Sequence, residues 1–214
     1  MKGRPVSTEA RAKPHVREPR AKGFRDGAYT RERILQEATA LIAERGYRNT
    51  TMKAVAKCVG VTEPAVYRHF DGKEELLVAV FSAAVSRILR PVAQDTSGPA
   101  IDGIARQLAL LMSPDQATLR RLIAEMYAAA LVEPKVTALA REFVDGASGL
   151  LVEELRRAVT EGDASPALDL SHARAFLHIF MTGLAHHETL ANDLIGDKGW
   201  SAFIERKLRQ FLAD

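Results

Sequence analysis

The stretch Thr62-Glu63-Pro64-Ala65-Val66-Tyr67-Arg68-His69-Phe70 decides how the N-terminal part of this 214-residue chain folds. Thr62 is a good N-cap, and Pro64 falls in the first turn of a helix, where its missing N–H costs little. Val66 and Phe70 are four residues apart, so they share one buried face of that helix. The pattern leaves the remaining polar and small side chains outward, namely those of Thr62, Glu63, Ala65, Arg68 and His69.

A second short helix is predicted just before this one. Val55 and Val59 are four residues apart and point inward, Thr50 or Thr51 caps the start, and Gly60 makes the turn that follows. Two short helices joined by a glycine turn are typical of a helix-turn-helix, whose second helix enters the major groove of DNA.

The amino-acid sequence of this region closely resembles the DNA-binding domain of TetR-family transcriptional regulators. The resemblance is carried by AVAKCVGVT at residues 54–62 and by VYRHFDGKEELL at residues 66–77. Outside this region it is limited to the helix pattern and the length of the chain. It implies an all-α protein with an N-terminal three-helix helix-turn-helix domain, joined by a long helix to a C-terminal helical domain for ligand binding and dimerisation.

The resemblance also assigns the residues that would touch DNA. The candidates for reading bases are Thr62, Glu63, Pro64, Ala65 and Arg68. The candidates for holding phosphates are Thr50, Thr51, Tyr67, His69 and Lys73. Hydroxyl groups and helix N-termini donate to phosphate, arginine forks onto guanine, and glutamate accepts from cytosine N4. Other roles stay open for four of these residues. Tyr67 or His69 would be a packing residue, Arg68 would contact only a phosphate, and Glu63 would only interact with the helix dipole.

Charge divides the chain into a basic front and an acidic rear. Residues 1–28 hold eight Lys/Arg and three Asp/Glu, residues 29–73 hold eight and five, and residues 74–214 hold fourteen and nineteen. Such asymmetry favours a chain that meets phosphates with one end. We expect a flexible basic arm over 1–28, a helix-turn-helix DNA-binding domain over 29–73 whose first helix is capped by Thr30, and a helical ligand-binding and dimerisation domain over 74–214.

Composition limits the class of protein further. Hydrophobic residues make up 47% and no run approaches the roughly 18 apolar residues of a membrane span, so a cytoplasmic protein without a membrane partner is expected. The single cysteine, Cys58, excludes an intramolecular disulfide, and we expect it to be a small buried or half-buried residue.

The last two predicted helices, roughly 170–192 and 199–213, carry apolar residues over more than one face. Such helices must bury one side against another chain, or else complete a monomeric core. In the TetR family this pair forms the dimer interface. The resemblance therefore implies a homodimer through residues 170–213 and, by two-fold symmetry, a palindromic operator.

The resemblance implies that the C-terminal part binds a small molecule that alters the spacing of the two DNA-binding heads. Apolar and aromatic candidates for this site, which would suit a hydrophobic or aromatic ligand, are Leu111, Met112, Met126, Tyr127, Phe143, Phe176, Phe180 and Met181. The alternative is that these residues are ordinary core. Arg120, Arg121 and Arg141 would pair with an acidic ligand or remain solvated.

Nothing in the sequence supports catalysis, a metal or a cofactor. We find no H-E-x-x-H, no G-x-S-x-G and no phosphate loop. His178 and His186 are too far apart to bind one ion from a single helix, and His186 and His187 point apart, which leaves only an interchain metal site.

The resemblance thus implies a homodimeric repressor that binds a palindromic operator and is released by a small ligand. Two alternatives stay open. One is an activator or a regulator that needs its ligand to bind DNA. The other is a helical small-molecule or metal-binding protein whose helix-turn-helix is unused.

Overall fold

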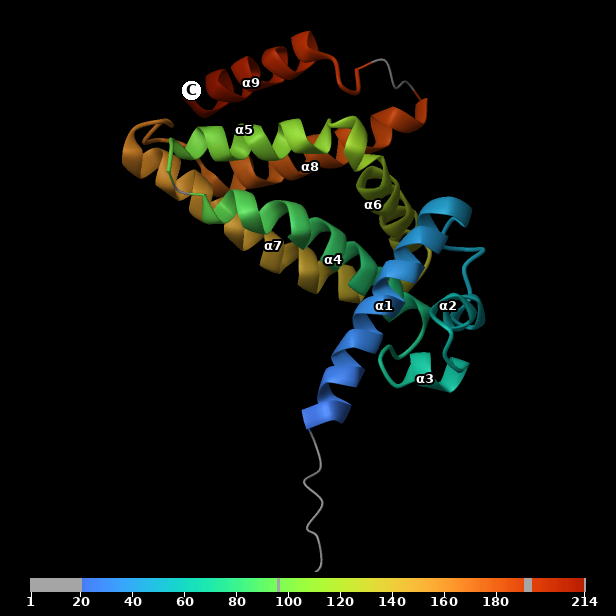
Figure 1. Cartoon of the computed structure of the whole chain (residues 1–214). Coiled ribbons are helices and arrows are strands. Elements are labelled where there is room, and N and C mark those ends of the chain that lie inside the picture. The colour runs from blue at the N-terminus through green and yellow to red at the C-terminus, as the bar shows by residue number, and fades with distance from the viewer. Residues whose placement is uncertain (1–20, 96, 191–193, 214) are drawn as a thin grey trace, which may run out of the picture.

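Helices form every regular element in the part of the chain that this computed structural model describes, residues 21–95, 97–190 and 194–213 (Figure 1). In chain order they are α1 (Ala21–Arg45), α2 (Met52–Val59), α3 (Glu63–Tyr67), α4 (Lys73–Gln94), α5 (Ala100–Leu111), the 3-10 turn η1 (Pro114–Gln116), α6 (Ala117–Ala130), α7 (Pro134–Glu161), α8 (Leu170–Leu190) and α9 (Lys198–Ala213). The all-α prediction is therefore confirmed. Among the described residues, no helix is both long enough and apolar enough to cross a bilayer.

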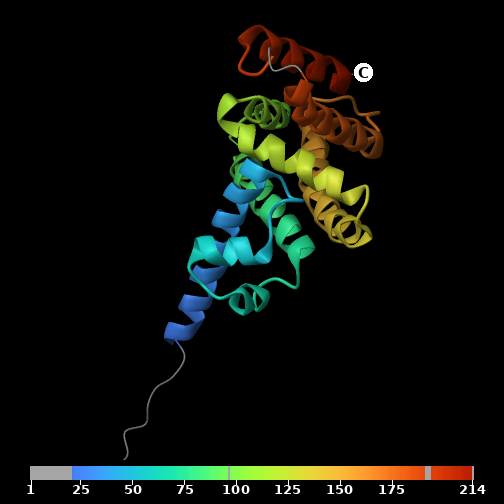
Figure 2. The ribbon, with the colours of Figure 1, turned by 90° about the vertical axis from the view of Figure 1, so that its right-hand side faces the viewer.

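The chain has a head and a body at opposite ends. Figures 1 and 2 show α1, α2 and α3 grouped at one end and α9 at the other, with α4 leading from the head into the body. We use "head" for α1–α3 with the first two turns of α4, and "body" for the rest. This arrangement keeps the surface of α3 far from the C-terminal helix.

Local signals position the two short helices of the head. The Thr51 side chain accepts a hydrogen bond from the Ala54 N–H at 3.1 Å and so caps α2. Gly60 ends α2 in the left-handed conformation, with φ of 78°, which favours glycine. Val66 and Phe70 are both buried, as their spacing predicts, and α3 begins after Thr62.

The start of α1 differs from the prediction. The helix begins at Ala21, so Thr30 lies in its interior and does not cap it, and residues 21–28 are helical rather than part of an arm. Most residues here are compatible with a helix, and threonine at position 30 costs little inside one, so the helix extends upstream. The rest of the predicted arm, residues 1–20, lies outside the described residues.

Head and body share packed side chains. Leu122 and Ala129 of α6 and Val136 of α7 belong to the same buried cluster as Val55 and Phe70 of the head. The first turns of α4 contribute Leu76, Leu77 and Val80 to this cluster, whereas Phe81 belongs to the cluster of the body. The proposed boundary at residue 73 therefore lies at the start of a helix that serves both parts.

Candidate nucleic-acid interface and effector cavity

Most of the residues predicted to contact DNA lie on the outer surface of the head. Tyr67 is 51% exposed, Arg68 at the C-cap of α3 is exposed, and so are Thr51, Thr62 and Pro64. Glu63 and His69 are partly exposed beside them. These side chains present hydroxyl, guanidinium, imidazole and carboxylate groups to solvent from two adjacent short helices, which contact each other closely.

Two predicted contact residues are buried instead. Ala65 is 8% exposed, so the expectation that it faces outward is wrong. Ala65 and Val66 are the two buried residues of the short α3, so both lie on its inner side. Thr50 is 2% exposed and its hydroxyl donates to the Gly46 carbonyl at 3.0 Å, which stabilises the loop before α2.

Lys73 has a different setting from an ordinary exposed lysine. Its Nζ donates to the Arg48 carbonyl at 3.1 Å and lies 4.2 Å from the centre of the Tyr47 ring. Burial lowers the pKa of Lys73, while the carboxylates of Glu133, Glu74 and Glu125 oppose that shift. This ammonium group therefore already has partners within the protein, in addition to any role on DNA.

The same loop ties the head to the body. The Tyr47 N–H donates to Glu125 of α6 at 2.8 Å, and its hydroxyl donates to Glu133, just before α7, at 2.9 Å. Burial and the Glu133 carboxylate raise the pKa of the Tyr47 hydroxyl, which keeps the donor protonated. A second tie involves the loop that follows α3, where the Asp71 carbonyl accepts a hydrogen bond from Lys135 of α7 at 2.9 Å.

Three exposed basic residues were missed by the sequence prediction. Arg48 lies in the loop before α2, and Lys53 and Lys57 lie one turn apart on the exposed side of α2. The signal was available, because Lys53 and Lys57 occupy positions on α2 that alternate with the buried Val55 and Val59. They extend the positive surface next to α3 and suit phosphate contacts.

Cys58 also lies on this surface. It is a free, exposed thiol, so the expectation that it is buried or half-buried is wrong. The buried side of α2 is completed by Met52, Val55, Ala56 and Val59, which leaves the position of Cys58 toward solvent.

The body contains a cavity of about 120 Å³ between α4, α5, α6, α7 and α8. Four predicted ligand-site residues line it, namely Leu111, Tyr127, Phe143 and Met181. Other lining residues are Phe81, Val85, Ile88, Gln107, Leu119, Ile123, Val144, Ala147, Ser148, Leu150, Leu151, His178 and Thr182. The walls are mainly apolar, as expected of a small-molecule site.

The other four predicted residues lie elsewhere. Met112 and Met126 are buried in the body without lining the cavity. Phe180 is partly buried, and Phe176 is 48% exposed and lies 4.3 Å, ring centre to ring centre, from Phe211 of α9. The helical spacing of apolar residues indicates which of them face inward, but it does not show which of them border a cavity.

One end of the cavity is polar. The Tyr127 hydroxyl and His178 Nε2 are 2.7 Å apart, and the Thr182 hydroxyl donates to the His178 carbonyl at 2.8 Å. Burial, and secondarily the charge of Arg174, lower the pKa of His178. Both effects favour the neutral imidazole, in which one nitrogen donates and the other accepts.

The buried carboxylate of Glu154 lies next to Gln107, one of the residues that line the cavity. Gln107 of α5 donates from its amide nitrogen to Glu154 of α7 at 2.8 Å, and both side chains are buried. Burial raises the pKa of Glu154, and the hydrogen bond from Gln107 partly opposes the shift. This pair joins α5 to α7 beside the cavity.

The arginines of the body take two different positions. Arg120 is 1% exposed and donates from Nη1 to the carbonyls of Leu111 and Ser113 at 2.6 and 2.7 Å, so it is neither solvated nor open to an acidic ligand. It satisfies carbonyl groups at the C-terminal end of α5. Arg121 and Arg141 are exposed. Within the described residues, no three His, Cys, Asp or Glu side chains converge as a metal site would require.

Comparison with known proteins identifies what this arrangement is similar to. Residues 34–80 match the family model for bacterial regulatory proteins of the tetR family. The HTH-type transcriptional regulator UidR of Escherichia coli K12 is 24% identical over 140 residues, which cover 65% of this chain and 71% of the relative.

Solved structures share the fold over most of the chain. Salmonella enterica GusR superposes with a TM-score of 0.75 at 22% identity, covering 86% of this chain and 95% of that one. FadR from Bacillus subtilis, in complex with stearoyl-CoA, superposes with a TM-score of 0.59 at 20% identity, covering 86% and 97%.

Proposed function

We propose that this protein, which belongs to the TetR family of transcriptional regulators, is a homodimeric repressor whose ligand-free form covers a palindromic operator. A small, mainly apolar molecule in the body cavity would release it. The observation that carries this proposal is that α4 and α6 each pack into the buried cluster of the head and also line the cavity.

Those two helices supply the coupling. On α4, Leu76 and Leu77 are packed in the head, whereas Phe81 and Val85 line the cavity. On α6, Leu122 is packed with the head, whereas Leu119 and Ile123 line the cavity. A ligand that fits better when α4 and α6 shift would move the head with them. The extent of release equals the difference in its affinity for the two conformations.

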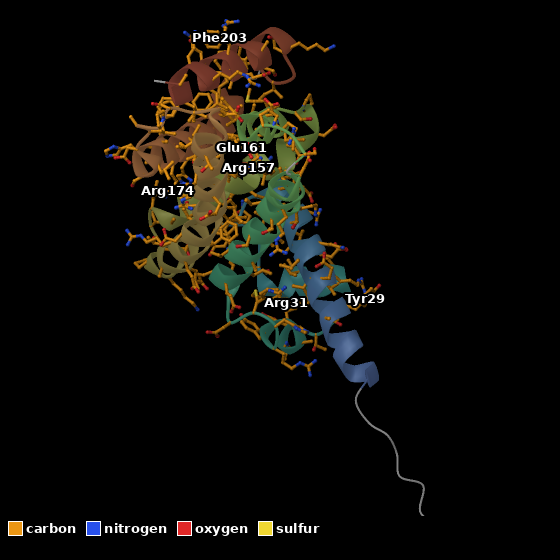
Figure 3. All side chains as sticks on the ribbon, turned by 90° about the vertical axis from the view of Figure 1, so that its left-hand side faces the viewer. Tyr29, Arg31, Arg157, Glu161, Arg174 and Phe203 are labelled. Atoms are coloured by element: carbon orange, nitrogen blue, oxygen red, sulfur yellow. The ribbon has the colours of Figure 1, made fainter. Side chains whose placement is uncertain are left out.

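Exposed apolar residues on the last two helices support the dimer. Ile179 is 70% exposed and Phe176 is 48% exposed on α8, and Phe203 is 37% exposed at the outer surface of α9 (Figure 3). Surfaces of this kind are typical of an interface. A second copy packed here in two-fold symmetry would present two heads to DNA, with half-sites about one helical turn (~34 Å) or somewhat more apart.

Its site of action would be the cytoplasm, where bacterial DNA lies. The family relatives and the DNA-facing surface support this location, and no cofactor or metal is required by the proposed mechanism.

Selection of bound sites from random duplex DNA, at about physiological salt, tests the proposal. Nonspecific phosphate binding is suppressed under these conditions, so a specific dimer should enrich a palindrome. Enrichment that appears only when a cell extract is added would indicate a regulator that needs its ligand to bind. No enrichment under either condition would contradict DNA-binding function.

Variants of the exposed surface then locate the contacts. Tyr67→Phe should weaken binding to every sequence by roughly 5- to 150-fold in the dimer, because each of the two hydroxyl contacts contributes about 0.5–1.5 kcal/mol. Arg68→Ala should also alter which half-site is preferred if the guanidinium reads a base. Arg141→Ala, which removes an exposed arginine from the body, is the matched control and should leave affinity unchanged. Parental affinity in Tyr67→Phe would contradict this docking geometry.

A further inference from the structure

We propose that the body cavity selects an uncharged ring compound that carries a hydroxyl group, and that Tyr127 and His178 bind this hydroxyl. The inference rests on the proposed effector role of the cavity and adds the chemical class of the ligand. Four observations lead to it: the charge of the walls, the hydrogen bonds at the polar end, the size of the cavity and the shape of its opening.

The walls favour a neutral ligand. The residues that line the cavity include no Asp, Glu, Lys or Arg, and their polar members are Gln107, Tyr127, Ser148, His178 and Thr182. Two charged side chains that do not line the cavity hydrogen-bond to lining residues: Glu154 accepts from Gln107, and Arg174 donates to the Ser148 hydroxyl at 3.2 Å. Burying an unpaired charge in such surroundings is costly, so a carboxylate or ammonium ligand is disfavoured.

Hydrogen-bond accounting at the polar end identifies the matching group. The Thr182 hydroxyl donates its one hydrogen to the His178 carbonyl. The Tyr127 hydroxyl and His178 Nε2 share one hydrogen at 2.7 Å. If tyrosine donates, its oxygen still has a lone pair that accepts. If histidine donates, the tyrosine hydrogen is available to a ligand, because its other neighbouring acceptor, the Thr182 hydroxyl oxygen, is 3.5 Å away, at the long limit of a hydrogen bond.

A ligand hydroxyl matches both of these cases. It both donates and accepts, so it pairs with the Tyr127–His178 couple whichever tautomer is present. A ketone or an ether only accepts, so it matches one tautomer alone. A hydrocarbon matches neither and would leave the buried polar groups without a ligand partner.

The size and opening of the cavity define the rest of the molecule. A volume of about 120 Å³ is close to the ~150 Å³ of an apolar protein cavity that accepts benzene, so a single ring fits. Phe81 and Phe143 meet edge to face at 5.3 Å and form an aromatic wall. Val85, Phe143, Ala147 and Leu150 also line a surface groove between α4 and α7, which provides room for a substituent on the ring.

Calorimetric titration of the full-length protein with three ring compounds tests the inference at neutral pH. The probes are p-cresol, toluene and 4-methylbenzoate, which differ in carrying a hydroxyl, no polar group or a carboxylate. We expect p-cresol to bind roughly tenfold more tightly than toluene, because one buried hydrogen bond is gained, and 4-methylbenzoate to bind most weakly. p-Cresol, but not toluene, should shift the ring-nitrogen NMR signals of His178.

Tyr127→Phe should reduce the preference for p-cresol over toluene to within about twofold while leaving the affinity for toluene unchanged. Tyr29→Phe makes the same chemical change at an exposed position on α1 and is the matched control, so it should retain the full preference. The unchanged toluene affinity shows that Tyr127→Phe is folded around the cavity.

Several results would overturn the inference: equal binding of toluene and p-cresol, tighter binding of 4-methylbenzoate, a full preference retained by Tyr127→Phe, or no binding of any probe. Selection of sites from random duplex DNA uses none of these probes. Failure of the ligand class is therefore distinguishable from failure of the proposed regulatory function.

Discussion

The helix-turn-helix surface draws its exposed side chains from residues 48–69, whereas the cavity draws on five helices whose lining residues run from Phe81 to Thr182. The first is a local segment with a packed core beneath it, and its chemistry faces solvent. The second is assembled from distant segments, and its chemistry faces inward. The comparison teaches that single side chains can set DNA contacts, while ligand response depends on how whole helices are placed.

The sharpest test of this contrast uses two leucines on α6. Leu122 is fully buried against the head, and Leu119, three residues earlier, is 7% exposed and borders the cavity. Leu122→Ala should lose about 3–5 kcal/mol of unfolding free energy, because it opens a new void in a packed core. Leu119→Ala should lose nearer about 2 kcal/mol, since part of its surface already faces open space.

Urea unfolding of both variants provides the measurement. Leu119→Ala should also accept a larger ring than the parent does. Equal losses in the two variants would mean that the cavity wall is packed as tightly as the head, and the contrast would fail.

A second test compares two lysines of the head. Lys73→Ala should lower stability by about 1–2 kcal/mol, because it removes the interactions with the Arg48 carbonyl and the Tyr47 ring. Lys57→Ala, at an exposed position on α2, should change stability by less than about 0.5 kcal/mol.

For DNA binding the order of the two effects should be reversed, with Lys57→Ala having the larger one. Lys57→Ala should reduce the slope of log affinity against log salt by about 1.8 in a dimer, because each of the two heads then neutralises one phosphate fewer. Thermal unfolding and salt-dependent titration of operator DNA measure the two effects. An equal fall in slope for Lys73→Ala would assign that lysine to a phosphate as well.

The smallest expected effect concerns pH and the carboxylate behind the cavity wall. Burial raises the pKa of Glu154, so the folded state holds this proton more tightly than the unfolded state does. The contribution of the Glu154 proton to folding stability is fully present below the pKa of Glu154 in the unfolded chain. It is lost as pH rises through the higher pKa of Glu154 in the folded protein. Glu154→Gln should therefore raise the melting temperature at pH 7 and lose that advantage near pH 4.

Glu153→Gln provides the control, because Glu153 is the adjacent, exposed carboxylate, which pairs with Arg156. It should not reproduce the pH-dependent gain. A melting temperature of Glu154→Gln that stays below the parent at pH 7 would show that the hydrogen bond from Gln107 outweighs the cost of burying the charge.

The helices of this protein are predictable where a few neighbouring residues decide them. Thr51 and Gly60 mark the two ends of α2 through a cap and a left-handed turn, and the structure places the ends there. The start of α1 is not predictable in this way. The sequence from Ala21 onward has no strong stop signal, so Thr30 has the chemistry of a cap without the position of one.

The candidate sites are predictable to different extents for the same reason. The exposed residues of α3 follow from the spacing of Val66 and Phe70, apart from Ala65, whose burial depends on packing against the rest of the head. The polar members of the cavity do not follow from spacing. Gln107 and His178 are 71 residues apart in the sequence and become neighbours of one cavity only through the packing of α5 and α8.

Cys58 gives the molecule a built-in position for a distance probe. It is the only cysteine in the chain, and its thiol is exposed on α2, within the head. A nitroxide attached there would place one spin label on each head of a dimer without any engineered mutation. Pulsed electron spin resonance would then read the distance between the two labels directly, with and without p-cresol.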